Sequence, residues 1–238
     1  YGPIDIFWLD DTPKAPESYD LDAIYALIRK LQPNCLVGEN NRYCGNGDFD
    51  ISEERWLEET PARPWEVCMP LASRWGYHRG DTNYKSVLTL IGMLRRCVFF
   101  GGNFLLNVGP YEDGRMQPVQ ESLLRDLGAW LDKHGEAIFG CNYISPGHAE
   151  WGEVSSSRGN TFYIHVDRWM GCSWTHTGLK SKALSARLLS TGEPVRFRQT
   201  APDRLVFEGL SEFPPDIHCN IIAIETEGVP VVSPWLEF

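Results

Sequence analysis

Two kinds of apolar pattern alternate along the first 140 residues. Short apolar runs predict buried strands at 4–9, 35–37, 67–71 and 104–108. Between the runs, apolar residues recur every three or four positions, which predicts amphipathic helices at about 21–31, 87–98 and 118–134. Ser18 and Asp20 are candidate caps of the first helix, and Pro33 marks its end. This alternation of strands and helices predicts a parallel sheet with right-handed crossovers.

The pattern changes after about residue 140. Short strands separated by turn residues are predicted at 161–166, 183–189, 195–198, 204–208 and 220–225. Their spacing is typical of a small antiparallel β-sandwich. We therefore expect two domains, residues 1–140 and residues 141–238, with the candidate chemistry in the first.

The number of predicted strands limits the architecture of the first domain. Four strands cannot close a (β/α)8 barrel, which needs about 250 residues by itself. The domain is therefore either an open sheet or one half of such a barrel. Tyr1 begins abruptly inside a predicted strand, so we expect that residues upstream of it are missing.

The composition narrows the classes of partner. The formal net charge is −10, whereas nucleic acids and anionic membranes both require a surplus of Lys and Arg on the contact face. No run approaches the roughly 20 apolar residues of a membrane span. The seven cysteines form no CxxC pair and no Cys/His cluster, so we expect no metal site. The many aromatic residues suit a neutral sugar, although aromatics also fill most cores.

Asp10 and Asp11 stand at the carboxyl end of the first predicted strand. In a barrel, that end of the strand opens onto the face that holds the active site. A carboxylate held there is suited to attack an anomeric carbon, because it stays ionised and its backbone aims it. The spacing alone favours a plainer role, in which one of these acids caps the next loop.

A second polar group follows the next strand end. It consists of Asn40, Asn41 and Arg42 and of the acidic stretch 48–54. A glycosidase needs a proton donor, a carboxyl group whose pKa is raised by burial or by a neighbouring negative charge. Glu53 and Glu54 in the acidic stretch are both candidates, although the stretch by itself is more typical of a solvated loop. Arg42 is either a surface charge or a donor to a sugar hydroxyl or to the nucleophile.

Aromatic and amide residues flank the later strands. Trp65 and Glu66 precede the third predicted strand, and the sequence Arg74-Trp-Gly-Tyr77 follows it. A tryptophan beside a carboxylate suits a sugar, which has an apolar ring face and polar hydroxyls, but such pairs are also common in cores. Asn107 is polar within an apolar strand, which is more typical of a hydrogen-bonded amide in a barrel interior. The sequence contains no dinucleotide-binding loop, serine-nucleophile elbow or HExxH motif.

Three motifs occur in a fixed order along the chain. They are Tyr1-Gly-Pro-Ile-Asp-Ile-Phe-Trp-Leu-Asp10, then Trp65-Glu-Val-Cys-Met69 with Trp75-Gly-Tyr77, and then Gly101-Gly-Asn-Phe-Leu-Leu-Asn-Val-Gly-Pro110. Together they resemble the α-L-fucosidase family, glycoside hydrolase family 29. The first is similar to the family's nucleophile strand, the second to a stretch reading roughly Trp-Glu-x-Cys-Met…Trp-Gly-Tyr, and the third to a late barrel strand. The similarity covers about residues 1–140.

The resemblance implies an enzyme that removes terminal α-L-fucosyl residues with retention of configuration. By position, Asp10 matches the nucleophile, Trp8 a pocket-lining aromatic residue and Arg42 an arginine that contacts the site. The chain departs from the family pattern at Asp11, where glycine is common, and at 70–73, where a more polar stretch is usual.

The proton donor is less closely defined by the resemblance. Glu53 matches the acid/base position of some members. The family places this residue variably, so Glu66 is a serious rival and Glu54 a lesser one. When Glu66 is not the donor, we expect it to bind substrate together with Trp65.

The resemblance also shapes the expected fold and partners. Family members grip the fucose hydroxyls with residues from earlier barrel strands, which this chain lacks. We therefore expect an α/β fold, namely the C-terminal half of a (β/α)8-type barrel followed by an antiparallel β-sandwich. The N-terminal half of the barrel would lie on a missing or separate polypeptide segment. The resemblance implies a fucosylated glycan substrate, no cofactor and a periplasmic or secreted location, and it leaves homo-oligomerisation open.

Two other functions fit the same residues. One is a retaining glycosidase of another specificity, for example for galactosides. The other is a non-catalytic fucose-binding protein that has lost its machinery. A panel of aryl glycosides separates the first from a fucosidase, and turnover itself excludes the second.

Overall fold

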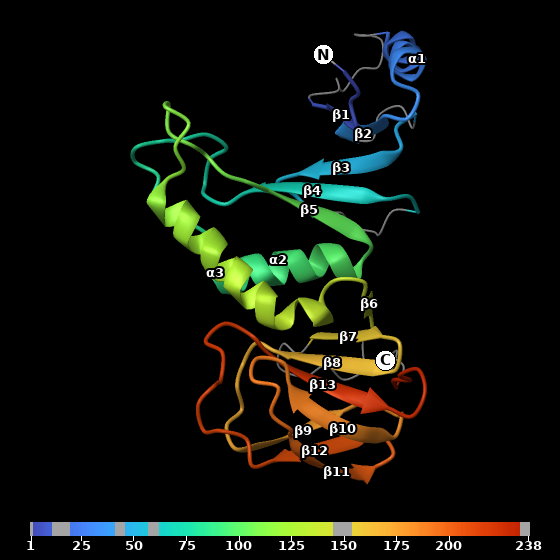
Figure 1. Cartoon of the computed structure of the whole chain (residues 1–238), viewed down its shortest axis with the longest axis vertical. Helices are drawn as coiled ribbons and strands as arrows, with labels where there is room; N and C mark the ends of the chain where they lie inside the picture. Colours follow the sequence, from blue (N-terminus) through green and yellow to red (C-terminus); the bar gives the residue numbers. More distant parts are fainter. Residues whose placement is uncertain (1, 11–19, 41–45, 57–61, 145–153, 234–238) are drawn as a thin grey trace. The chain divides into compact units, whose positions relative to one another are not determined.

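The computed structural model describes residues 2–10, 20–40, 46–56, 62–144 and 154–233 (Figure 1). The chain forms two compact units. The first comprises Tyr1–Tyr84 and Phe100–Gln120, and the second comprises Lys85–Phe99 and Glu121–Phe238. Each unit is defined by contacts in space and is made of two separate segments of the chain. The expected domain boundary at residue 140 therefore stays a prediction.

The first unit is built on a five-stranded parallel sheet. Its strands pair in chain order: β1 (Ile6–Leu9), β2 (Leu36–Asn40), β3 (Phe49–Glu53), β4 (Trp65–Pro70) and β5 (Gly102–Asn107). The expectation of four strands was wrong, because β3 lies where a solvated acidic loop was the alternative. Strand β3 lacks the apolar pattern of a buried strand, because its buried residue Asp50 is polar and forms an ion pair with Arg63.

The sheet is strongly curled. The indole Nε1 of Trp8 on β1 donates a hydrogen bond of 2.9 Å to Oε1 of Glu66 on β4. Neighbouring strands lie about 4.8 Å apart, so β1 and β4 would be separated by roughly 14 Å in a flat sheet. The two side chains meet because the sheet curves around the face that carries them, which we call the inner face. Such a curled parallel sheet is the geometry of part of a barrel wall.

Side chains alternate between the two faces of the sheet. Trp8 and Asp10, Asn40, Glu53 and Glu66 lie on the inner face, as their mutual hydrogen bonds and the strand register require. The outer face is covered by helix α1 (Leu21–Leu31), which Asp20 caps by accepting a hydrogen bond from the backbone N–H of Ala23. Apolar residues of the helix and of the outer face form one cluster: Leu21, Tyr25, Ile28, Cys35 and Val37, with Phe7 and Leu9 against it.

The outer face also holds a buried polar network. Glu39 is fully buried and accepts hydrogen bonds from the Tyr25 hydroxyl and from Nη2 of Arg63, the latter at 3.1 Å. Nε of Arg63 also donates to Asp50 at 2.9 Å. Each carboxylate is thus paired with the same guanidinium. The network joins the outer face to the α1 layer and to the segment before β4.

The second unit contains helices α2 (Val87–Phe99) and α3 from Glu121 onward, and two antiparallel sheets. Helix α3 as a whole spans Pro118–His134, and the short helix η2 spans Gly135–Ala137. One sheet has the order β10-β13-β8-β7-β6 and the other the order β11-β12-β9. The strand bounds are Asn142–Tyr143 (β6), Val154–Arg158 (β7), Thr161–Val166 (β8), Ser173–Thr177 (β9), Ala183–Leu188 (β10), Arg196–Ala201 (β11), Arg204–Glu208 (β12) and Asn220–Thr226 (β13).

Both antiparallel sheets contribute to one hydrophobic core. Phe162 and Ile164 on β8 lie in the same cluster as Leu205 and Phe207 on β12, and all four are fully buried. On the side of the helices, Arg95 pairs with Asp167 at 2.6 Å, and the indole of Trp130 donates to the carbonyl of Cys219 at 2.9 Å. These contacts tie α2 and α3 to the larger sheet. In the described part of the chain, no helix has both the length and the apolarity that a membrane crossing requires.

Candidate active site

Asp10 and Glu53 are brought together by the side chain of Asn40. Its Nδ2 donates one hydrogen bond to Oδ1 of Asp10 at 3.2 Å and another to Oε2 of Glu53 at 2.8 Å. The three residues stand at or just beyond the carboxyl ends of β1, β2 and β3, because Leu9 is in register with Glu39 and Asn40 with Ile51. Three adjacent strand ends therefore deliver two carboxylates and one amide to a single point on the inner face.

The shared amide determines how far apart the two carboxylates are. Their bonded oxygens lie 3.2 and 2.8 Å from one nitrogen. The two N–H bonds of an amide diverge by roughly 120°, which sets the separation of these oxygens at about 5 Å. Retaining glycosidases hold their two carboxyl groups roughly 5–5.5 Å apart, whereas inverting enzymes leave about 6.5–9.5 Å for a water molecule. The geometry suits direct attack by one carboxylate while the other transfers a proton.

Glu66 lies on the same face, one strand further along. It accepts the hydrogen bond from Trp8, so the tryptophan that was predicted to line the site spans the curl between β1 and β4. Among the residues that the structure describes, neither Glu53 nor Glu66 takes part in an ion pair. Both are partly exposed, and Asp10 is exposed, so all three carboxylates are accessible to a ligand.

Cys68 belongs to the same group, and the sequence analysis did not single it out. It is in register with Glu53, two positions beyond Glu66 on β4, and therefore faces the inner side. Burial and, to a smaller extent, the charges of Glu53, Glu66, Asp10 and Glu54 together raise the pKa of its thiol to about 11. All four predicted acids thus surround one thiol. The register of β3 against β4 would have revealed it, but β3 was not recognised as a strand.

Glu54 lies one residue beyond the end of β3. Its φ of 52° is in the left-handed region, which is uncommon for a residue other than glycine. The backbone N–H of Glu54 donates to the carbonyl of Cys68 at 3.0 Å, which holds this conformation at the strand end. The side chain is exposed, unlike that of Glu53. The twist at Glu54 thus ends the strand directly after the inward-facing Glu53.

Two of the sequence-predicted residues are not part of this group. Trp65 lies on the outer face, where its ring contacts the Gly102 position and its Nε1 donates to the carbonyl of Phe100 at 3.0 Å. The side chain is almost fully buried, so the structure does not bring it to the carboxylates. Arg42 lies outside the described residues, as does Asp11.

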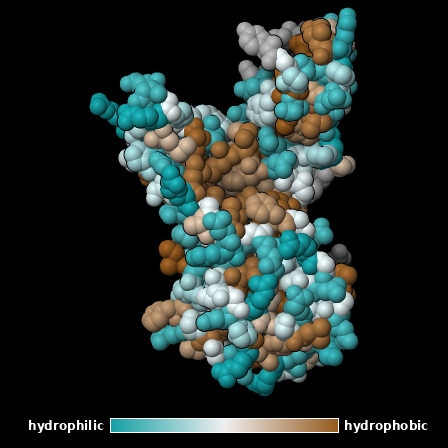
Figure 2. All heavy atoms as spheres, in the orientation of Figure 1, coloured by the Kyte–Doolittle hydropathy of each residue, from teal (hydrophilic) through white to brown (hydrophobic). Residues whose placement is uncertain are grey.

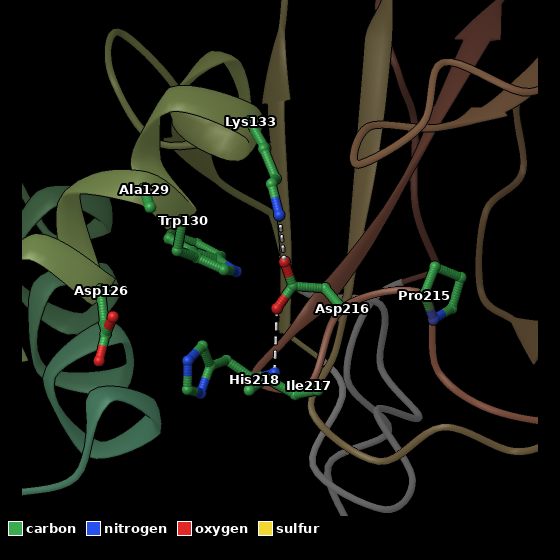
Figure 3. A pocket seen from close by; sticks show the side chains of 8 residues that line it. All are labelled: Asp126, Ala129, Trp130, Lys133, Pro215, Asp216, Ile217 and His218. Atoms are coloured by element: carbon green, nitrogen blue, oxygen red, sulfur yellow. Dashed lines mark hydrogen bonds and ion pairs between the residues drawn. The ribbon is translucent and has the colours of Figure 1, made fainter.

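A separate pocket of about 230 Å³ lies in the second unit, between α3 and the segment before β13 (Figure 3). One of its buried residues is Asp216, which points toward Lys133 and accepts a hydrogen bond from the backbone N–H of His218 at 3.0 Å. Lys133 lies 3.5 Å from the same carboxylate. Asp216 is therefore already occupied in joining α3 to the strand layer, and the pocket contains none of the predicted catalytic residues.

The inner-face carboxylates are held by neutral donors, an amide and an indole. Carboxylates held in this way can transfer a proton or attack a carbon atom. In the described segments, no three His, Cys, Asp or Glu side chains are grouped so that they could hold a metal ion.

Comparison with known families identifies the lineage of this site. Residues 1–136, which contain the whole inner-face group, match the family model described as α-L-fucosidase. The chain belongs to the α-L-fucosidase family. The sequence-based recognition is thereby confirmed.

Individual members of the α-L-fucosidase family are similar along much of the chain. Tissue α-L-fucosidase of Bos taurus is 34% identical over 152 residues, which covers 58% of this chain and 32% of that protein. The human tissue enzyme is 26% identical over 235 residues, covering 90% of this chain and 49% of that protein. α-L-Fucosidase isoenzyme 1 from Paenibacillus thiaminolyticus has a structure with a TM-score of 0.82 at 30% identity, covering 95% of this chain and 59% of that one.

The chain is shorter than the relatives that it matches. The 238 residues span between about a third and a half of the curated fucosidases that they match. The structural match nevertheless extends over nearly the whole chain, antiparallel sheets included. Both units therefore have counterparts in one fucosidase structure.

Proposed function

We propose that the protein is a retaining exo-α-L-fucosidase in which Asp10 is the nucleophile and Glu53 the general acid/base. Membership of the α-L-fucosidase family supports the substrate class. The observation that carries the mechanism is the Asn40 amide, which bridges the two carboxylates at 3.2 and 2.8 Å. It holds them at the separation that a double displacement requires.

The reaction proceeds in two steps. Asp10 attacks the anomeric carbon of the fucosyl residue, and the bond from that carbon to the departing oxygen breaks as Glu53 transfers its proton to the oxygen. A covalent fucosyl-enzyme remains. Glu53, now ionised, takes a proton from water, the water oxygen attacks the anomeric carbon, and the ester bond to Asp10 breaks. Two inversions give net retention, and Glu53 is left protonated for the next cycle.

Glu66 remains the rival for the proton donor. It accepts a hydrogen bond from Trp8, whereas Glu53 is the carboxylate that shares the Asn40 amide with Asp10. We therefore assign Glu66 to substrate binding, together with Trp8. Single replacements of Glu53, Glu54 and Glu66 by Gln test this assignment, because loss of the true donor slows substrates with poor leaving groups far more than activated aryl fucosides.

We also propose that a polypeptide segment outside these residues completes the barrel, and that the antiparallel sheets of the second unit form a β-sandwich. In the described chain, β1 and β5 each pair with only one neighbour. Large apolar side chains are exposed in and next to the edge strand β1, on α1 and at the start of β2: Ile4, Ile6, Leu27, Leu31 and Leu36. Figure 2 shows brown residues in the region of α1. A further strand and helix would cover this edge and supply contacts to the fucose hydroxyls.

A panel of aryl glycosides tests the proposed function. The full-length protein should hydrolyse aryl α-L-fucosides and leave the corresponding galactosides intact. Proton NMR during the first minutes should show α-L-fucose as the initial product. Release of β-L-fucose would contradict retention, and fucose binding without turnover would contradict the assignment as an enzyme.

A further inference from the structure

Two loops lie side by side beyond the carboxyl ends of β4 and β5 (Figure 1). Asn107, at the end of β5, is in register with Pro70 and so shares the inner face with Cys68. Its Nδ2 donates to the carbonyl of Trp75 at 2.8 Å. This hydrogen bond draws the loop after β4 over the inner-face side of the sheet, which is the side that the catalytic carboxylates occupy.

The two loops are in close contact through a glycine. A Cβ added at Gly109 would lie 2.8 Å from the carbonyl carbon of Gly76 and 2.9 Å from the nitrogen of Tyr77, which are both backbone atoms. Only glycine allows this approach. The polar groups of Gly109 are satisfied by two buried glutamines, because Gln117 donates to its carbonyl at 2.6 Å and Gln120 accepts from its N–H at 3.0 Å. The contact is therefore a fixed feature of the fold.

Polar side chains order the loop after β4 as well. Asp81 accepts hydrogen bonds of 3.1 Å from the backbone N–H groups of Asn83 and Ser73, and these bonds lower the pKa of its carboxyl group. The hydroxyl of Tyr84 donates to Gln117 at 3.0 Å and so links this loop to the loop after β5. The two loops are therefore held together as one ordered unit.

This structure presents two tyrosine rings. Tyr77 and Tyr111 meet edge to face, with their centroids 4.8 Å apart and their planes at 69°. The guanidinium of Arg115 lies 6.0 Å from the centroid of the Tyr111 ring. Tyr77 remains 41% exposed although its backbone is held by the Gly109 contact. A side chain that served only to join the loops would be covered by them.

We propose that Tyr77, backed by Tyr111, is a stacking platform for the leaving-group sugar, the neutral pyranose to which the fucosyl residue is attached. This inference rests on the proposed function. A fucosyl residue held with its anomeric carbon at Asp10 directs its aglycone outward, past the carboxyl ends of the strands. A pyranose ring has an apolar face that fits an exposed aromatic ring. Arg115 and the tyrosine hydroxyls supply hydrogen bonds at the edges of that ring.

Two substrates with the same fucosyl group separate this role from catalysis. α-L-Fucosyl fluoride has no sugar in its leaving group, whereas an α-L-fucosyl disaccharide has one. For Tyr77→Ala we expect kcat/KM to fall about 10-fold on the disaccharide and less than about 2-fold on the fluoride, because only the former uses the stacking surface. Tyr77→Phe, which keeps the ring, should restore most of the disaccharide activity.

Tyr143→Ala is the control variant, because it removes a tyrosine of similar exposure in the second unit. It should leave kcat/KM unchanged on both substrates. Equal losses on both substrates for Tyr77→Ala, or no loss on either, would overturn the platform while leaving the proposed function intact. Absence of turnover of either substrate by the unaltered protein would contradict the proposed function itself, and with it this inference.

Discussion

The parallel sheet of the first unit carries acidic residues on both faces, and the two sets have different partners. On the outer face, Glu39 and Asp50 are almost fully buried and share the guanidinium of Arg63. On the inner face, Asp10 and Glu53 share the neutral amide of Asn40. Glu39 and Asn40 are consecutive residues of one strand, so the contrast arises from strand alternation alone.

The difference shows what each set is suited to do. A buried carboxylate paired with arginine is held in place by a full countercharge and lies out of reach of a ligand. A carboxylate held by a neutral amide keeps its place without a full countercharge from that partner. Such a group remains able to attack a carbon atom or to carry a proton. The outer set is therefore expected to support the fold, and the inner set to support the reaction.

The largest expected effect follows loss of the nucleophile. Asp10→Asn keeps the shape of the side chain but removes its charge, and turnover of aryl fucosides should fall on the order of 10⁴-fold. The matched outer-face variant Asp50→Asn should retain turnover per folded molecule within about 3-fold. Steady-state kinetics, normalised to the folded fraction from circular dichroism, measure both. Similar losses for the two variants would remove the distinction between the faces.

The reverse effect is expected for stability. Glu39→Gln leaves Arg63 with one carboxylate fewer in a buried network, which should lower the free energy of unfolding by about 3 kcal/mol. Glu66→Gln on the inner face loses no ion pair among the described residues and should change it by less than about 1 kcal/mol. Urea denaturation compares the two variants. A larger loss for Glu66→Gln would contradict the assignment of structural acids to the outer face.

The amide between the two catalytic acids can be converted into a third acid. Asn40→Asp removes both donated hydrogen bonds and places a third negative charge against the two carboxylates, so they should no longer be held at their present separation. We expect kcat/KM to fall about 100-fold. Asn46→Asp, at an exposed amide that also donates to a carboxylate, should leave kcat/KM unchanged. An unchanged kcat/KM for Asn40→Asp would show that Asn40 does not position the pair.

The smallest expected effect is on the alkylation rate of Cys68, which reports on the charges of the inner face. Burial and the surrounding carboxylates raise the pKa of this thiol to about 11, so little of it is thiolate at pH 8. Glu53→Gln removes one of those charges, lowers the pKa and should speed alkylation by iodoacetamide about 3-fold. Asp50→Asn lies on the opposite face and should leave the rate unchanged. Mass spectrometry of the Cys68 peptide measures the rate, and acceleration by Asp50→Asn would contradict the assigned faces.

Much of the fold could be predicted from apolar spacing. Helices α1 and α3 begin and end where the pattern predicts, and strands β8 and β12 agree residue for residue. Two of the missed strands, β3 and β7, share a physical cause, because polar residues occupy buried positions in both. In β3, Asp50 and Ser52 are buried in polar contacts, and in β7 two buried positions are serines.

The candidate site was predictable to a different extent. Asp10 and Glu53 could be named from strand ends and family motifs, yet the bridge between them depends on Asn40, which had been noted only as a neighbour of Arg42. Trp65 and Glu66 are adjacent in sequence, and only Glu66 faces the carboxylates. Which of two neighbours faces inward is decided by strand register, and the register became known only once β3 was placed.

Trapping of the covalent intermediate tests the central claim most directly. A 2-deoxy-2-fluoro-α-L-fucosyl fluoride should glycosylate the protein with loss of fluoride, because the fluorine at C2 slows both displacements while the good leaving group speeds only the first, so that the intermediate accumulates. After proteolysis, mass spectrometry should find the fluorofucosyl group esterified to Asp10. A label on Glu53 or Glu66, or release of the sugar without any labelled peptide, would contradict the account.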